Sequence, residues 1–156
     1  MGAVVGSGCN VRSGYFKSEY IQVAALTAMT HTAMRLGLEK GVAFISVQKA
    51  RTNIRNLQFA IVKKTFVRNA PFEDSIGEGD PGTNYFGIAM EKLAAMMGTG
   101  YRSGHFEGTL RRGESPYRGG LIRQEGDYMV YVGFSGGTQD QDVEISEFGM
   151  KMLFPQ

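Results

Sequence analysis

The sequence predicts one α+β domain, in which helices pack on an antiparallel sheet of about five strands. Three observations lead to this prediction. The chain has 156 residues, the size of one ordinary domain. Segments with a helical repeat of apolar residues alternate with pairs of strand-like segments, in the order α-β-β-α-β-β-α. Within each pair the connection is too short for a parallel crossover, so neighbouring strands should run antiparallel.

The first helix is predicted from Ser18 to about Leu38, where apolar residues recur at helical spacing. Ser18 is a suitable N-cap, and Gly37 or Gly41 can end the helix. The positions that define this repeat are Ile21, Ala24, Ala25, Ala28, Thr32 and Leu36.

Two strands are predicted next, at 42–48 and 57–67, because both segments are rich in β-branched and aromatic residues. The polar and basic connection between them, QKARTNIRN, is interpreted as a solvated hairpin end, with a ligand clamp as the alternative. Residues 69–83 are rich in proline, glycine and acidic residues, which is typical of a loop. This loop is long enough to act as a lid or flap.

The helical repeat returns over residues 84–98 and predicts the second helix, with Thr83 or Asn84 as its N-cap. The apolar positions of this repeat are Phe86, Ala89, Leu93 and Met96 or Met97.

The last third of the chain predicts an irregular segment, a hairpin and a helix. Residues 99–120 are rich in glycine and have no fixed period. The segments 120–124 and 127–134 alternate as strands do and should turn at Glu125–Gly126. A final helix is predicted from about Gln139 to Leu153.

Composition argues against several classes of partner. Seventeen basic and fifteen acidic residues leave a net charge of +2, without the clustered basic charge of a nucleic-acid-binding protein. No apolar run reaches the roughly 18 residues that cross a membrane. The opening segment lacks the features of a secretory signal, and the single cysteine, Cys9, excludes an internal disulfide. We therefore expect a cytoplasmic protein with a flexible N-terminal tail at 1–14 and one domain at 15–156.

The segment YVGFSGGTQDQD, residues 131–142, connects the last strand to the last helix. Gly136 and Gly137 suit a tight turn, and Thr138 or Asp140 can cap the helix. Asp142 lies in the first turn, where the helix dipole favours negative charge. The same glycines can instead present backbone N–H groups to a carboxylate or phosphate. The nearby aspartates would repel such an anion unless it approaches from the glycine side.

This segment, with the preceding GGLIR, resembles the closing signature of the GlcG/HbpS-like haem-binding family. A double glycine that opens the preceding strand in that family is matched by Gly119 and Gly120. The chain departs from the family in its long QKARTNIRN connection and in lacking a proline after the double glycine. The positions that match the signature are Gly133, Ser135, Gly136, Gly137, Gln141 and Asp142.

The resemblance implies a profilin-like α+β domain, similar to the C-terminal domain of PduO-type corrinoid adenosyltransferases. It implies a homo-oligomer built from dimers, up to a tetramer or octamer. Some members of the family are associated with haem binding or haem degradation. The resemblance therefore makes haem the cofactor that we expect first.

Arginine and tyrosine residues surround the double glycine in the sequence, and guanidinium groups suit a carboxylate. A ligand site is one interpretation of this pattern, and a solvated basic rim is the other. The ligand-binding residues that we predict are Tyr117, Arg118, Gly119, Gly120, Arg123, Ser135, Gly136, Gly137 and His105. Further candidates for the same cluster are Arg111, Arg112, Tyr101 and Tyr128.

The chain has only two histidines, and a haem iron takes a single proximal histidine. His31 is our first candidate for this metal ligand and His105 the second, although each is also compatible with an ordinary packed or surface position. Our first hypothesis is a domain that binds haem or another apolar ligand with a carboxylate group. The second is an enzyme, or an accessory subunit, acting on a small organic acid. Arg118 or Arg123 would then bind the acid, while His105 or Tyr117 would move a proton. A purely structural oligomerisation module is the third.

Overall fold

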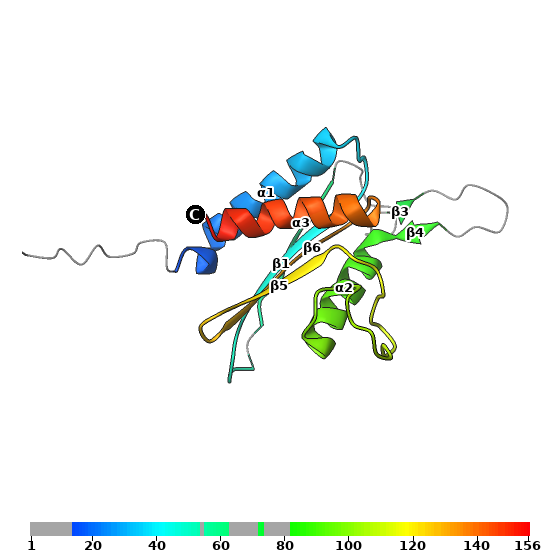
Figure 1. The fold of residues 1–156 in the computed structure, drawn as a ribbon. Helices are drawn as coiled ribbons and strands as arrows, with labels where there is room; N and C mark the ends of the chain where they lie inside the picture. Colours follow the sequence, from blue (N-terminus) through cyan, green and yellow to red (C-terminus); the bar gives the residue numbers. More distant parts are fainter. Residues whose placement is uncertain (1–13, 54, 63–71, 74–81) are drawn as a thin grey trace, which may run out of the picture.

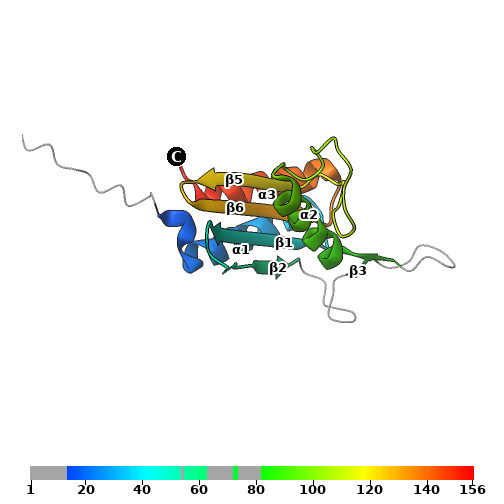
Figure 2. The same ribbon diagram turned by 90° about the horizontal axis from the view of Figure 1, so that it is seen from below.

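The structure is a computed structural model that describes residues 14–53, 55–62, 72–73 and 82–156. It has an α+β fold in which one antiparallel sheet, in the order β2-β1-β6-β5, lies between two layers of helices. Helices α1 and α3 cover one face and α2 crosses the other (Figures 1 and 2). The elements are η1 (Tyr15–Lys17), α1 (Glu19–Arg35), β1 (Val42–Lys49), β2 (Gln58–Ile61), β3 (Phe72–Glu73), β4 (Thr83–Asn84), α2 (Tyr85–Thr99), β5 (Gly120–Glu125), β6 (Tyr128–Ser135) and α3 (Gln139–Leu153).

The predicted antiparallel arrangement is confirmed, and β1 is the strand that organises it. Its whole length, from Val42 to Lys49, pairs with β6, while its first half also pairs with β2. Seven of its eight residues are buried, because helices cover the sheet on both faces. The sequence predicted about five strands. The structure places four in this sheet, and β3 pairs with β4 in a separate two-stranded ladder.

Helix α1 begins where predicted, since the Ser18 side chain accepts a hydrogen bond from the Ile21 backbone N–H. The predicted apolar stripe is partly wrong. Ala25 and Thr32 are buried, but the other four positions are half-buried. The repeat was misassigned because α1 has apolar side chains on every side, so the sequence does not define one buried face. The buried positions are Gln22, Ala25, Leu26, Met29, Thr30, Thr32 and Ala33.

Two hydrophobic clusters lie on opposite faces of the sheet. On one face α1 and α3 pack against Ile45, Val132 and Phe134. On the other face α2 packs against Val42, Phe44 and Tyr131. The second cluster contains the predicted α2 stripe residues Ala89, Leu93 and Met96, whereas Met97 is half-exposed.

The β5–β6 hairpin turns one residue later than predicted. Glu125 pairs with Tyr128, so the two turn residues are Gly126 and Asp127. Gly126 has φ +57°, which suits the first position of a tight hairpin turn.

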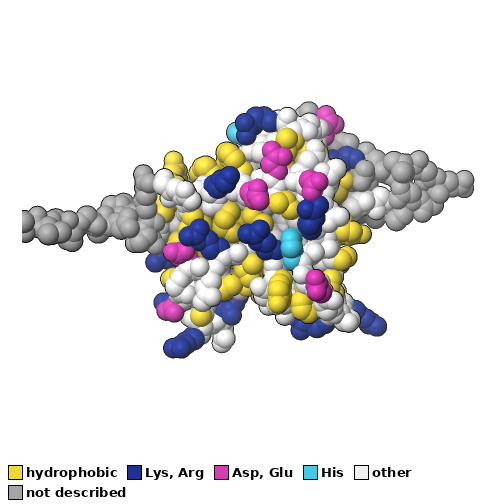
Figure 3. Space-filling view, viewed as in Figure 1, with side chains coloured by type: hydrophobic (Ala, Val, Ile, Leu, Met, Phe, Trp, Pro, Cys, Tyr) yellow, Lys and Arg dark blue, Asp and Glu magenta, His cyan; other side chains and the backbone are white. Residues whose placement is uncertain are grey.

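Several predicted features lie outside the described residues. They are Cys9, the tail at 1–14 except Gly14, residues 63–67 of the predicted second strand, and most of the predicted flap at 69–83. Within the described part of the chain, no helix is both long and apolar enough to span a membrane. On the face that Figure 3 shows, basic and acidic side chains are interspersed among apolar ones.

Candidate functional site

A pocket of about 350 Å³ lies between α2 and the turn that connects β6 to α3. Helix α2 supplies one wall and the glycine turn the other, and Tyr117 closes it from the loop before β5. We call it the α2–glycine-turn pocket. Its lining residues are Tyr85, Ile88, Lys92, Tyr117, Ser135, Gly136, Gly137, Thr138, Gln139 and Asp142.

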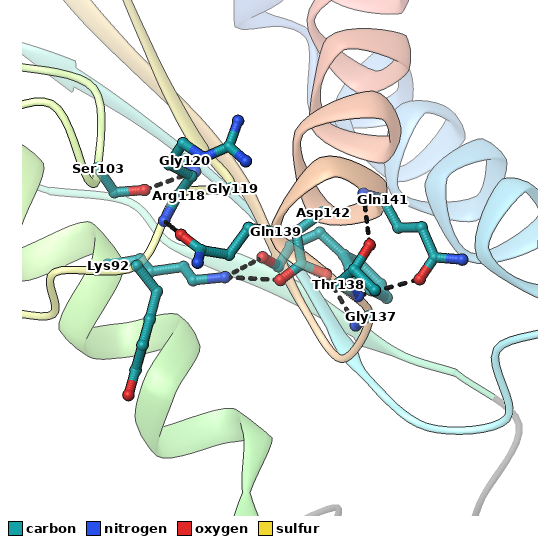
Figure 4. Close-up of polar contacts among 12 residues, drawn as sticks. Lys92, Ser103, Arg118, Gly119, Gly120, Gly137, Thr138, Gln139, Gln141 and Asp142 are labelled. Atoms are coloured by element: carbon teal, nitrogen blue, oxygen red, sulfur yellow. Dashed lines mark hydrogen bonds and ion pairs between the residues drawn. The ribbon is translucent and has the colours of Figure 1, made fainter.

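A buried ion pair lines this pocket. Lys92 comes from the middle of α2 and Asp142 from the first turn of α3, and their side chains point toward each other (Figure 4). Lys92 Nζ lies 2.8 Å from Asp142 Oδ2 and donates a second hydrogen bond of 2.8 Å to the Phe134 carbonyl. Both residues are almost fully buried, with 1% and 3% of their surface exposed. The pair therefore ties together two helices that cover opposite faces of the sheet.

Burial and pairing act on these two groups in opposite directions. Burial lowers the pKa of the Lys92 ammonium and raises the pKa of the Asp142 carboxyl, because it disfavours the charged form of each. Their mutual attraction and hydrogen bond oppose both shifts. Removing either partner would leave the other charge buried without compensation.

The glycine turn binds an internal carboxylate, which is the structural one of the two roles that the sequence allowed for its N–H groups. The Gly137 N–H donates a 2.8 Å hydrogen bond to Asp142 Oδ1, and the Gly136 N–H also stabilises this carboxylate. We expected Asp142 to repel an anion, but the fold turns its side chain back onto the glycines. Gly136 is required here, because a Cβ would come within 2.6 Å of the Lys40 carbonyl and φ is +152°.

The end of α3 nearest the pocket is fixed by a capping box. Thr138 Oγ1 accepts a hydrogen bond from the Gln141 N–H, and Gln141 Oε1 accepts one from the Thr138 N–H. This confirms Thr138, and not Asp140, as the N-cap. The cap orients the first turn of α3, from which Asp142 reaches Lys92 (Figure 4).

Gly119 and Gly120 do not line the pocket. Their lack of a side chain leaves space for the residues that form its inner wall. A Cβ on Gly119 would lie 2.8 Å from Lys92 Nζ and 2.7 Å from Asp142 Cβ. The Gly120 N–H donates a 2.7 Å hydrogen bond to Ser103 Oγ. The double glycine thus lets the start of β5 approach the ion pair closely, which is a packing role.

The predicted arginine and tyrosine cluster is split in the structure. Arg118 forms a 2.6 Å ion pair with Asp140, beside the pocket. Arg123 lies further along β5, where its guanidinium stacks 3.9 Å from the centre of the Phe154 ring. Arg111 pairs with Glu114, and neither Tyr101, Tyr128 nor Arg112 lines the pocket. Of the predicted ligand-binding residues, Tyr117, Ser135, Gly136 and Gly137 line it.

Neither histidine lies in the pocket. His31 is exposed on α1, which covers the face of the sheet opposite α2. His105 is exposed in the loop after α2, where its Nδ1 lies 3.3 Å from the Ser103 carbonyl oxygen. Within the described residues, no group of three or more His, Cys, Asp or Glu side chains could hold a metal ion.

Sequence analysis missed the Lys92–Asp142 pair. A signal for it was present, because Lys92 falls three residues after Ala89 and four before Met96, on the apolar stripe of α2. A lysine on such a stripe needs an anionic partner. The sequence does not identify that partner, since Asp142 is 50 residues away.

Comparison with known proteins identifies the fold. No family model matches the sequence, and no curated protein matches it either. The solved PduOC:heme complex superimposes with a TM-score of 0.54 and 14% identity, over 86% of this chain and 93% of that one. Protein ORFY of Klebsiella pneumoniae, of the DUF336 family, has a TM-score of 0.50 and 16% identity, over 86% and 90%. The chain therefore has the GlcG/PduO C-terminal-like fold that the resemblance implied.

Proposed function

We propose that this chain is a small-molecule-binding domain whose ligand occupies the α2–glycine-turn pocket. The observation that carries the proposal is a pocket in which Tyr85, Ile88 and Tyr117 surround the buried cation Lys92. Its volume of about 350 Å³ falls within the range of roughly 300–1,000 Å³ typical of small-molecule sites. Mostly apolar walls with a few polar groups are also typical of such sites.

The lining favours a ligand with an apolar body and a carboxylate group. The two tyrosine rings and Ile88 offer apolar surface to the body. The Lys92 ammonium has three N–H donors, and it uses two of them on Asp142 and Phe134. A ligand carboxylate can accept the third. Asp142 already accepts from Lys92 and Gly137, so a ligand carboxylate would join this ion pair at the remaining N–H and would not replace Asp142.

Haem is one ligand of this class, and the PduOC:heme complex, with the same fold, supports it. The residues do not fit a histidine-bound haem in this pocket, because His31 and His105 both lie outside it. The pocket offers only the phenol oxygens of Tyr85 and Tyr117 as the kind of side chain that can bind haem iron in place of histidine. We therefore propose binding through the porphyrin faces and acid groups, without a histidine ligand from the same chain.

Hemin and metal-free protoporphyrin IX test this proposal together. We expect both to change absorption on titration and to raise the melting temperature, because a ligand that binds the folded state stabilises it. Tyr117→Ala should raise the Kd of both compounds by about tenfold, because the contact between the porphyrin and the tyrosine ring is lost. His31→Ala and His105→Ala are the matched controls and should bind as the unsubstituted chain does. The proposed mode is wrong if hemin binds but protoporphyrin does not, or if a histidine variant loses binding.

The alternative, an enzyme or accessory subunit that acts on a small organic acid, gains no support from the arginines. Arg118 is already paired with Asp140, and Arg123 is stacked on Phe154 away from the pocket. A melting-temperature screen of small organic acids distinguishes the two functions. The alternative would be favoured if small acids raise the melting temperature of the unsubstituted chain but not of Arg118→Gln, and if porphyrins raise neither.

A further inference from the structure

A second pocket, of about 160 Å³, lies between the C-terminal half of α2 and the loop that follows it. We call it the loop pocket. It shares no lining residue with the α2–glycine-turn pocket. The two pockets are neighbours in the sequence, because Ser115 and Pro116 line the loop pocket and the next residue, Tyr117, lines the other. Phe106 helps to close it, and its ring lies over Gly108, where a Cβ would come within 2.5 Å of the ring.

Two buried serine hydroxyls line the loop pocket. Ser103 and Ser115 are only 2% and 1% exposed. Ser103 Oγ accepts a 2.7 Å hydrogen bond from the Gly120 N–H, and Ser115 Oγ accepts one of 3.1 Å from the Tyr117 N–H. Each hydroxyl also has an O–H group to donate. Both oxygens thus have a hydrogen-bond partner in the fold, and their O–H groups can donate to an acceptor on a molecule in the pocket.

The charge of the lining favours an anion as that acceptor. Arg102 lines the loop pocket and forms no ion pair with any residue that the structure describes. No acidic side chain is among the lining residues. Two hydroxyl donors and one guanidinium group are the kinds of donor that bind a carboxylate.

The rest of the lining is mostly apolar and limits the size of the bound molecule. Ala95, Phe106, Leu110 and Pro116 supply the apolar surface, and the Thr99 hydroxyl already donates to the Ala95 carbonyl. An apolar cavity of about 150 Å³ holds a molecule the size of benzene. The loop pocket, at about 160 Å³, is therefore large enough for a carboxylate group with a few carbon atoms. We infer that the loop pocket binds a short-chain monocarboxylate, with its carboxylate at Ser103, Ser115 and Arg102 and its tail against Phe106 and Leu110.

The inference is tested by NMR titration of the ¹⁵N-labelled full chain with sodium acetate, propionate and hexanoate. We expect saturable shifts of the Ser103, Ser115 and Gly120 amide signals with acetate and propionate. Propionate should bind more tightly because its extra methylene is buried, and hexanoate should be excluded by size. Sodium chloride at equal concentration should produce no saturable shift.

Two variants and a matched control locate the site. Arg102→Gln should raise the Kd by about tenfold or more, the loss expected for one charge-assisted hydrogen bond. Ser115→Ala should weaken binding too, and its amide spectrum checks that the loop remains folded. Arg112→Gln removes an exposed arginine of the same loop that does not line the pocket, and it should bind as the unsubstituted chain does.

Three results would overturn the inference. They are shifts that do not saturate, equal weakening by Arg102→Gln and Arg112→Gln, and saturable shifts at Gly137 in place of Ser103 and Ser115. The first would mean that the pocket holds only water. The third would place the acid in the α2–glycine-turn pocket, whose own test uses porphyrins, so failure of one proposal leaves the other standing.

Discussion

Lys92 places an ammonium group in the interior, at the point where α2 meets the start of α3. Burying a charge is tolerated only when a partner and further hydrogen bonds compensate for lost water. Asp142 and the Phe134 carbonyl supply this compensation, and the Gly137 N–H in turn holds Asp142. The walls of the candidate site are therefore positioned by one chain of polar contacts.

Lys92→Met and Asp142→Asn should each lower the free energy of unfolding by about 3–5 kcal/mol, because each leaves the other charge buried and unpaired. The double variant should lose less than the sum, since it buries no uncompensated charge and the introduced amide oxygen can still accept from the Gly137 N–H. Urea unfolding of the four chains measures these values.

Arg118→Gln is the matched control for the buried pair. Its ion pair with Asp140 is largely exposed, so the loss should stay within about 1 kcal/mol. Additive losses in the double variant, or single-variant losses as small as that of Arg118→Gln, would show that Lys92 and Asp142 do not act as a buried pair.

Individual site residues were predicted only in part. Tyr117, Ser135, Gly136 and Gly137 do line the candidate pocket, because the segments that contain them lead directly into and out of the last hairpin. Arg123 does not, since it lies further along β5 from Gly120 and stacks on Phe154. Nearness in sequence suggested one cluster, but an extended strand rises roughly 3.3 Å per residue and carries its side chains apart.

At the scale of elements, the start of α3 determines where Asp142 points. Thr138→Ala should lower the free energy of unfolding by about 1 kcal/mol, because the Gln141 N–H loses its acceptor. Thr138→Ser retains the hydroxyl and should lose much less. Chemical denaturation measures both, and equal losses would show that the methyl group of Thr138, and not the cap, matters.

Element boundaries were predicted well where local chemistry defines them. Ser18, Asn84 and Thr138 each accept a hydrogen bond from the first turn of their helix. Residue type predicted Ser18 alone at the first helix and one of two nearby residues at each of the other two. The buried face of α1 was predicted poorly, because its apolar residues surround the helix. Which of them are buried depends on where the sheet and α3 lie, and no local pattern contains that information.

At the scale of the whole molecule, α1 presents a partly apolar outer surface. Tyr20 is 79% exposed and Val23 is 48% exposed on that helix. We expect a second copy of the chain to cover this surface, in keeping with the homo-oligomer that the resemblance implies. Exposed apolar side chains in neighbouring positions are typical of protein interfaces.

The double variant Tyr20→Ser/Val23→Ser should therefore convert a dimer or larger assembly into monomers. Analytical ultracentrifugation of the purified chain measures this directly. Tyr101→Ser, which alters a 55% exposed tyrosine in the loop after α2, is the control and should keep the assembly. A monomeric unsubstituted chain, or an unchanged mass in the double variant, would contradict the prediction.

The sequence by itself determined the α+β class, the three α-helices, the two antiparallel hairpin pairs β1–β2 and β5–β6 and the glycine turn, whereas it missed β3 and β4 and left two helix caps open between two residues each. The features that it determined depend on hydrogen bonds and repeats within a few residues, so a local pattern contains them. Only the tertiary structure decided that Lys92 meets Asp142, that the glycine turn binds this carboxylate, and that the arginines separate. Those contacts join residues far apart in the chain, and they form only once the strand order and the rotation of each helix are set.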